Sequence, residues 1–268
     1  MSRIAACFAA LKAQGKKALI PYITAGDPTL EITLTLMHKL VEAGADILEL
    51  GIPFSDPMAD GSVIQLACER ALLHNTSLHQ VLALVRTFRA TNNHTPVVLM
   101  GYMNPFEVMG AEIFAKDASE AGVDGVLTVD MPPEESEEVL VHYRAKGLDS
   151  IFLLAPTTSV ARMKLICEKS SGFVYYVSLK GVTGAANLDL TEVAAKMKEI
   201  GAVTALPIGV GFGIRDAASA ASVAQLSDAV VVGSAIVRKI QDNLENTDKM
   251  VTEISEFIRG IRQAMDQK

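Results

Sequence analysis

Two carboxylates, Glu49 and Asp60, stand at opposite ends of one loop rich in proline and glycine. The apolar run Asp46–Leu50 before the loop predicts a strand buried on both faces, as strands of parallel sheets usually are. The prolines that follow cannot continue a strand ladder, so Gly51–Gly61 is predicted to be a loop. An ionised glutamate on a buried face is unfavourable unless it is paired or reaches a cleft. Glu49 is therefore a candidate functional residue.

Helix capping is the alternative role for a carboxylate beside a loop. Asp60 precedes an amphipathic run that begins near Val63, and periodicity alone favours a cap on that helix. Asp130 follows the predicted strand Gly125–Val129, and we interpret it as a cap too. Glu49 lies inside a strand pattern, where there is no helix start to cap. It is the strongest of the three candidates.

Glycines gather after three successive predicted strands, at Gly181–Gly184, Gly211–Gly213 and Gly233–Ser234. Glycine lets the backbone approach a ligand closely, and the amides at a helix N-terminus bind phosphate well. These positions predict a phosphate site, with ordinary turn glycines as the alternative. Lys180 stands just before the first of these loops, where an aldolase could place a Schiff-base lysine. We favour a solvated or phosphate-steering lysine.

A repeating unit of strand, loop and helix must position these residues. After a helix near Ile4–Gln14, strands are predicted at Ala18–Thr24, Asp46–Leu50, Pro96–Met100, Gly125–Val129, Ser150–Leu154, Phe173–Val177, Pro207–Val210 and Ala229–Val232. About eight such units of roughly 33 residues match the size of a (β/α)8 barrel. We predict an α/β fold, a (β/α)8 TIM barrel with an extra N-terminal helix, as one domain over residues 1–268. An open doubly wound sheet is the alternative, because strand closure is not visible in a sequence.

Local signals predict several helix boundaries. Asp27–Pro28 predicts an N-cap followed by proline at the first helical position. Gly101–Gly110 is predicted to be a loop before the next helix. Pro133 is predicted to open a helix that ends at Lys146, and a long helical region is predicted from Ser234 onward.

Composition narrows the possible partners. The net charge is −7 and lysines and arginines form no cluster, which disfavours nucleic acid and anionic membrane surfaces as partners. The three cysteines form no CxxC pair, so we expect no disulfide or zinc site and a reducing, cytoplasmic setting. The five histidines fall in predicted helices or at their ends, which argues against a catalytic metal. We also expect no secretion signal and no membrane span.

These segments together resemble the family of tryptophan synthase α subunits. Leu48–Gly61, which reads LELGIPFSDPMADG, is similar to the signature of that family almost letter for letter. Other similar segments follow in chain order: Pro21–Pro28, Asp130–Ser136, Gly181–Gly184, Gly211–Gly213 and Gly233–Ala235. The resemblance spans essentially the whole chain. It implies a lyase that cleaves indole-3-glycerol phosphate to indole and glyceraldehyde 3-phosphate by a retro-aldol reaction, in the last steps of tryptophan biosynthesis.

The resemblance also implies roles for individual residues. Glu49 would match the general acid–base and Asp60 the second catalytic carboxylate. The phosphate-binding positions would be Gly184, Gly213, Gly233 and Ser234. The residues around the indole would be Tyr22, Ile64, Tyr102, Leu127, Tyr175 and Phe212. Thr183 would match a mobile loop residue that closes over the site and contacts Asp60.

The chemistry of carboxylates fits this reaction. Cleavage of the C–C bond needs one proton delivered to the indole carbon and another removed from the glycerol hydroxyl. One carboxyl whose pKa is raised by apolar surroundings can do both in turn, which suits Glu49. An ionised Asp60 could accept a hydrogen bond from the ring N–H and stabilise the positive charge of the protonated indole.

The resemblance further implies a partner. The family forms an α2β2 complex with a β subunit that carries pyridoxal phosphate, so no cofactor and no metal are expected in this chain. Pro53–Asp60 is expected to contribute to that contact and to couple partner binding to catalysis. Two other functions stay open. One is a Schiff-base aldolase that uses Lys180, and the other is a catalytically silent subunit whose Gly51–Gly61 loop only docks a partner.

Overall fold

The computed structural model describes residues 2–177, 190–211 and 213–267. Within these ranges nine parallel strands form one sheet in the order β5-β4-β3-β2-β1-β9-β8-β7-β6. The strands are β1 (Ala18–Thr24), β2 (Leu48–Gly51), β3 (Val97–Gly101), β4 (Gly125–Thr128), β5 (Asp149–Ile151), β6 (Leu153–Leu154), β7 (Val174–Val177), β8 (Ile208–Gly211) and β9 (Ala229–Val232). The two ends of this order, β5 and β6, are separated in the chain by Phe152 alone. The sheet therefore nearly closes into a barrel.

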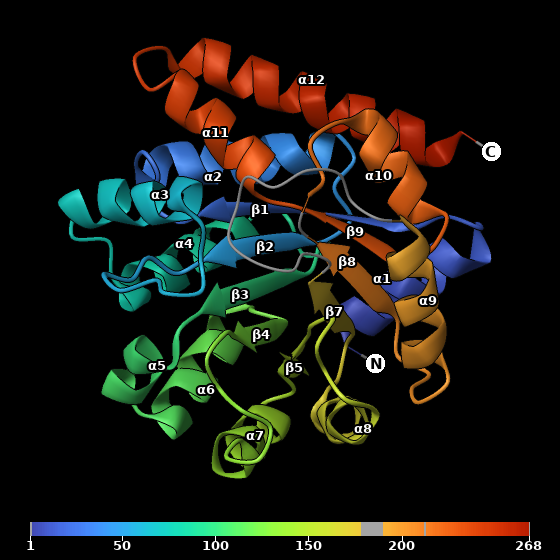
Figure 1. The fold of residues 1–268 in the computed structure, drawn as a ribbon. Helices are drawn as coiled ribbons and strands as arrows, with labels where there is room; N and C mark the ends of the chain where they lie inside the picture. The colour runs from blue at the N-terminus through green and yellow to red at the C-terminus, as the bar shows by residue number, and fades with distance from the viewer. Residues whose placement is uncertain (1, 178–189, 212, 268) are drawn as a thin grey trace.

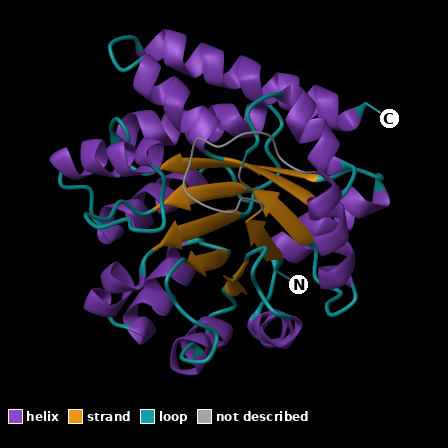
Figure 2. Cartoon of the chain, viewed as in Figure 1, coloured by secondary structure: helices purple, strands orange, loops and turns teal. Residues whose placement is uncertain are grey.

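Helices surround the strands on the outside, as Figures 1 and 2 show. In the described part of the chain they are α1 (Arg3–Ala13), α2 (Leu30–Glu42), α3 (Ser62–Leu73), α4 (Leu78–Arg89), α5 (Met103–Met109), α6 (Ala111–Ala121), α7 (Glu137–Ala145), α8 (Val160–Lys169), α9 (Leu190–Gly201), α10 (Ala217–Ala224), α11 (Ser234–Asp242) and α12 (Thr247–Asp266). This arrangement confirms the predicted TIM barrel with an extra N-terminal helix. The fifth predicted strand is interrupted at Phe152, which gives nine strands in place of eight.

Alternation along the strands separates an inner core from an outer one. Leu48 and Leu50 of β2 belong to the outer core, which packs against the helices. Ile47, just before β2, belongs to the inner core, together with Ile20 of β1 and Val98 of β3. Apolar side chains therefore lie on both sides of the sheet, as the sequence predicts for a parallel sheet.

Helix α1 fills the amino end of the barrel. Its Ile4, Phe8 and Leu11 belong to the same inner cluster as the barrel residues. The ring of Phe8 lies 5.8 Å from that of Phe173, just before β7. Apolar side chains therefore fill this end of the barrel. Ligands of TIM barrels bind at the opposite end, where the strands have their carboxyl ends.

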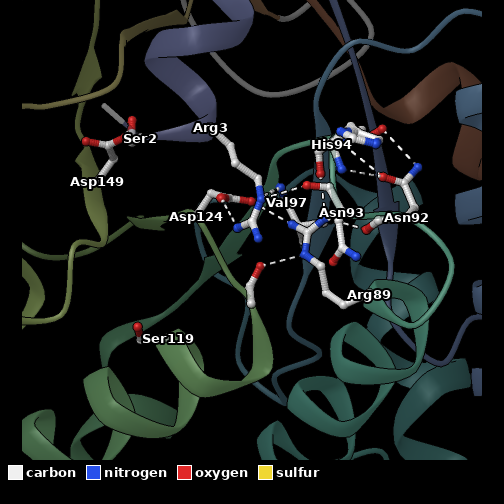
Figure 3. A network of polar contacts seen from close by, with 12 residues as sticks. Ser2, Arg3, Arg89, Asn92, Asn93, His94, Val97, Ser119, Asp124 and Asp149 are labelled. Carbon is white, nitrogen blue, oxygen red and sulfur yellow. Dashed lines mark hydrogen bonds and ion pairs between the residues drawn. The ribbon is translucent and has the colours of Figure 1, made fainter.

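A polar network also ties this amino end together (Figure 3). Arg89 of α4 is buried, and it donates to Asp124 at 2.6 Å and to three backbone carbonyl oxygens. Arg3 of α1 donates to the other carboxylate oxygen of Asp124 at 2.9 Å. The hydroxyl of Ser2 donates to Asp149 at 2.6 Å. The network therefore links α1 and α4 to the segments that enter β4 and β5.

One predicted loop is a helix. Met103–Met109 forms α5 inside the predicted loop Gly101–Gly110. The amide of Met103 donates to Oδ1 of Asp130 at 2.7 Å, so Asp130 caps a helix on the neighbouring strand end and not the helix after it. Pro105 occupies the first turn, where an amide has no partner inside the helix, so proline is tolerated there.

Two helix starts were also predicted wrongly. The N-cap of α2 is Thr29, whose side chain accepts from the amide of Ile32. Asp27 instead forms a bidentate ion pair with Arg70 of α3, at 2.7 and 2.8 Å. Its carboxylate is fully buried, and leaving a buried charge without a cation costs more free energy than leaving a helix without a side-chain cap. Pro133 lies in a turn before α7, where the hydroxyl of Ser136 donates to its carbonyl oxygen.

The buried ion pair between Arg89 and Asp124 is expected to stabilise the fold strongly. Arg89→Ala should lower the free energy of unfolding by about 3 kcal/mol or more, because buried Asp124 loses its buried cation and three carbonyl oxygens lose the donor that Arg89 supplies. Arg144→Ala removes an exposed pair with Glu137 and should cost less than about 1 kcal/mol. Urea unfolding of both variants tests this expectation, and equal losses would contradict it.

Candidate active site

A cavity of about 510 Å³ opens at the carboxyl ends of the strands. Of the residues predicted from the sequence, Asp60 and Tyr175 line it. The remaining lining residues are Ala59, Met100, Thr128, Val129, Asp130, Met131, Pro132, Pro133, Phe152, Leu153, Leu154, Ala155, Thr158, Arg162, Ile166 and Val177. Most of these side chains are apolar, which suits a flat hydrophobic ligand held by a few polar groups.

Glu49 is the most unusual polar residue in this region. It lies on β2 opposite Tyr22 of β1 and Val98 of β3, and it is 1% exposed. Its Oε1 atom has no hydrogen-bond partner among the described residues. Burial, with a smaller contribution from the negative charge of Asp60, raises the pKa of Glu49 to about 8. The carboxyl therefore holds its proton near neutral pH and can release it to a neighbouring group.

Asp60 does not cap the helix that follows it. The N-cap of α3 is Gly61, and no side chain caps this helix. Oδ2 of Asp60 instead accepts a hydrogen bond from the hydroxyl of Tyr102 at 2.8 Å. Burial raises the pKa of Asp60, and this hydrogen bond opposes the rise. The capping role that periodicity alone favours for Asp60 is therefore wrong, because its hydrogen-bond donor is Tyr102, which follows β3 and is 42 residues away along the chain.

Two tyrosines lie beside these carboxylates, each over a glycine of the next strand. A Cβ atom on Gly51 would lie 2.1 Å from the hydroxyl oxygen of Tyr22, and one on Gly211 would lie 2.0 Å from that of Tyr175. Burial raises the pKa of both tyrosines, and the charges of Glu49 and Asp60 raise each further. Any larger residue at these two positions would clash with a tyrosine hydroxyl, so glycine is required there.

The predicted indole residues form two adjoining groups. Tyr22 and Ile64 belong to one small cluster, and Leu127 and Tyr175 belong to the inner core. Met100 packs against both groups. The sequence analysis missed Met100, although it ends a predicted strand on the same face as Val98, and that alternation could have found it.

Tyr102 and Phe212 complete the predicted indole set. The ring of Tyr102 stacks on that of Phe54 at 5.3 Å, and its hydroxyl bonds to the loop that carries Asp60. Phe212 lies outside the described residues.

The predicted phosphate residues that are described follow two paired strands. Gly213 follows β8 and Gly233 follows β9, and these strands are hydrogen-bonded neighbours. Ser234 is the first residue of α11, whose N-cap, Gly233, supplies no side-chain cap. An uncapped helix start of this kind can bind an anion with its first amides. Besides Phe212, the predicted residues Lys180, Thr183 and Gly184 lie outside the described part of the chain.

The described residues lack the features of a metal site, a disulfide and a membrane-spanning helix. Across the described residues, no group of three or more His, Cys, Asp and Glu side chains is placed to hold a metal ion. The cysteines Cys7, Cys68 and Cys167 are free thiols. In the same part of the chain, no helix has the length and apolar character that a membrane crossing requires.

Comparison with known proteins identifies close relatives. The family model described as tryptophan synthase alpha chain matches residues 8–266. The tryptophan synthase alpha chain of Thioalkalivibrio sulfidiphilus is 61% identical over 266 residues, which cover 99% of this chain and 100% of the relative. That of Marinobacter nauticus is 59% identical, with 99% and 98% covered. The solved tryptophan synthase subunit alpha of Legionella pneumophila has a TM-score of 0.92 at 47% identity, with 99% of each chain covered.

The buried carboxyl of Glu49 is expected to make stability depend on pH. The folded chain keeps this proton up to about pH 8, whereas the unfolded chain releases it near its ordinary value of 4.5, so rising pH between these values disfavours the folded state. Glu49→Gln removes the titration. Between pH 6 and pH 9 the variant should therefore gain about 2–3 kcal/mol in unfolding free energy relative to wild type. Urea unfolding across this range measures the difference, and parallel curves would contradict the assignment.

Proposed function

The chain belongs to the family of tryptophan synthase alpha chains, and on that premise we propose how its residues carry out the reaction. It cleaves indole-3-glycerol phosphate to indole and glyceraldehyde 3-phosphate, a retro-aldol step in tryptophan biosynthesis. The observation that carries the proposal is that buried Glu49, whose Oε1 has no hydrogen-bond partner among the described residues, interacts electrostatically with Asp60, which lines an apolar cavity.

Glu49 acts as acid and then as base. Its carboxyl donates a proton to the ring carbon that carries the glycerol chain, and the ring nitrogen takes up the positive charge. As the C–C bond breaks, its electron pair returns to the ring and neutralises that charge. The adjacent hydroxyl becomes the aldehyde and gives its proton back to Glu49. A raised pKa favours both halves of this cycle, because the group is protonated at the start and basic once it has ionised.

Asp60 stabilises the positive charge on the ring. An ionised carboxylate beside the ring N–H would accept its hydrogen bond and would bind the protonated ring more tightly than the neutral one. The position of Asp60 in the cavity wall, close enough to raise the pKa of Glu49, supports this role. Because this stabilisation grows as positive charge develops on the ring, it lowers the activation barrier for C–C bond cleavage.

The remaining predicted residues bind the substrate. We propose that the phosphate is held by Gly213, Gly233 and Ser234 at the start of α11, together with Gly184. The indole ring is proposed to contact Tyr22, Ile64, Tyr102, Leu127, Tyr175 and Phe212. Thr183 is proposed to belong to a segment that closes over the bound substrate.

The partner is proposed to be a tryptophan synthase β subunit. The family membership supports an α2β2 complex in the cytoplasm, in which the β subunit carries pyridoxal phosphate and this chain, one domain over residues 1–268, carries no cofactor. Residues of Pro53–Asp60 and of α5 are proposed to dock it. Met58 in this loop and Val108 in α5 are 86% and 84% exposed, and apolar side chains this exposed are typical of a surface that another protein covers.

The roles of the two carboxylates are tested by indole release from indole-3-glycerol phosphate. Glu49→Gln should lower turnover at least about a hundredfold because the amide cannot shuttle a proton, and Asp60→Asn should lower it strongly because the ring charge loses its partner. The chain contains no tryptophan, so indole fluorescence is measured against a low background. Unchanged binding of inorganic phosphate would show that both variants are folded. Full activity in either one would remove that residue from the mechanism.

The docking surface is tested with a charge in place of an exposed apolar side chain. Met58→Asp should weaken binding of a purified β subunit about tenfold or more and reduce its stimulation of indole release, since a charge would be buried at the contact. Val141→Asp in α7 makes the same change at another exposed position and should leave binding unchanged. Equal affinities for the two variants would place the contact elsewhere.

A further inference from the structure

Tyr102 connects the Asp60 carboxylate to the backbone of its own loop. The amide of Ala59 donates to the hydroxyl oxygen of Tyr102 at 3.0 Å, and that hydroxyl lies 2.8 Å from Oδ2 of Asp60. A backbone amide can only donate, so the tyrosine oxygen must be the acceptor in the first bond. The hydroxyl proton is then free to go to Asp60. The direction of both hydrogen bonds is thus fixed by chemistry.

The position of this hydroxyl is itself well defined. Tyr102 is 3% exposed and stands at the N-cap of α5, directly after β3. Its ring stacks on Phe54, and the amide that follows it is held by Asp130. A hydroxyl held from a strand end can orient a carboxylate on a flanking loop, because it has little freedom to move with that loop.

We propose that Tyr102 is a positioning residue for Asp60: it occupies Oδ2 and leaves Oδ1 as the acceptor for the N–H group of an aromatic substrate ring. This inference rests on the proposed role of Asp60, and it adds to the proposed contact of Tyr102 with the indole ring. Oδ1 receives no hydrogen bond from the described residues, so it is the oxygen left to recognise a ring N–H.

The surroundings of Asp60 explain why such a donor is needed. Among the described residues, the titratable groups that interact electrostatically with it are Glu49 from β2, Tyr22 from β1, Tyr175 from β7, Cys68 from α3 and Tyr102, none of which carries a positive charge. Asp130 and Arg162 line the same cavity, and Arg162 forms an ion pair with Glu134. Burial raises the pKa of Asp60, and the hydrogen bond from Tyr102 is the influence that lowers it. Tyr102 therefore favours the ionised form that the reaction uses.

Tyr102→Phe tests the proposal because it removes the hydroxyl and keeps the ring against Phe54. The pKa of Asp60 should rise, so the acid limb of kcat/KM for indole release should move to higher pH. At neutral pH kcat should fall about tenfold, with KM changed less than about twofold, since one hydrogen bond to a charged group is lost. Circular dichroism and inorganic phosphate binding check that the variant is folded.

A second variant reverses the direction of the effect. Tyr102→3-fluorotyrosine, incorporated at this one position, has a more acidic hydroxyl and should donate more strongly to Asp60. The acid limb of kcat/KM should then move to lower pH. A role in packing alone would give no shift of opposite sign in the two variants. If Tyr102→Phe folds poorly, the fluorinated variant alone tests the proposal, because an acid limb at the wild-type pH would overturn it.

Two controls separate the possible failures. Tyr176→Phe removes another buried hydroxyl, on the outer face of β7 and without a hydrogen-bond partner among the described residues, and should leave the pH profile unchanged. Asp60→Asn gives the activity that remains without the carboxylate. If Asp60→Asn is inactive while both Tyr102 variants keep the wild-type profile, the positioning role is wrong and the proposed function stands. If Asp60→Asn is fully active, the proposed role of Asp60 fails as well.

Discussion

The active end of this barrel depends on one buried glutamate, Glu49, whose Oε1 has no hydrogen-bond donor among the described residues. The inner face of β2 and its neighbours is apolar around Glu49, and Oε1 has no partner among the described residues. Under these conditions the neutral carboxylic acid is the favoured form. Burial and the nearby charge of Asp60 raise the pKa of Glu49 to about 8. Burying such a group destabilises the chain once it ionises, so the rest of the barrel must be stable enough to hold it there.

The two ends of the barrel treat their polar groups differently. At the amino end Asp124 accepts from Arg3, Arg89 and the amide of Val97, and α1 fills the interior with apolar side chains. At the carboxyl end Oε1 of Glu49 has no donor among the described residues, and α11 begins without a side-chain cap. A network with every member paired adds rigidity, whereas an open donor or acceptor is available to a ligand. This difference is how one scaffold provides stability at one end and chemistry at the other.

The sequence predicts the barrel because its signals are local, and it predicts less where partners are distant in the chain. The apolar runs set the strands, and Glu49 was identifiable because a charged residue interrupts such a run. The partner of Asp60 is Tyr102 and that of Asp27 is Arg70, each more than forty residues away along the chain. Asp27 was therefore misinterpreted as a cap, and periodicity alone favoured the same role for Asp60. Helix α5 was missed because its proline falls in the one turn that tolerates it.

The difference between Glu49 and Asp60 lies in their donors rather than in their chemistry as carboxylic acids. Two carboxylates this close are hard to ionise together, because each raises the free energy of charging the other. The hydrogen bond from Tyr102 favours ionisation of Asp60, whereas Glu49 lacks such a donor at Oε1 and keeps its proton. The hydroxyl of Tyr102 beside Asp60 and the missing donor at Oε1 of Glu49 thus favour the anion at Asp60 and the acid at Glu49. Since the retro-aldol reaction needs both forms at once, the donor to Asp60 matters as much for the chemistry as the carboxylates themselves.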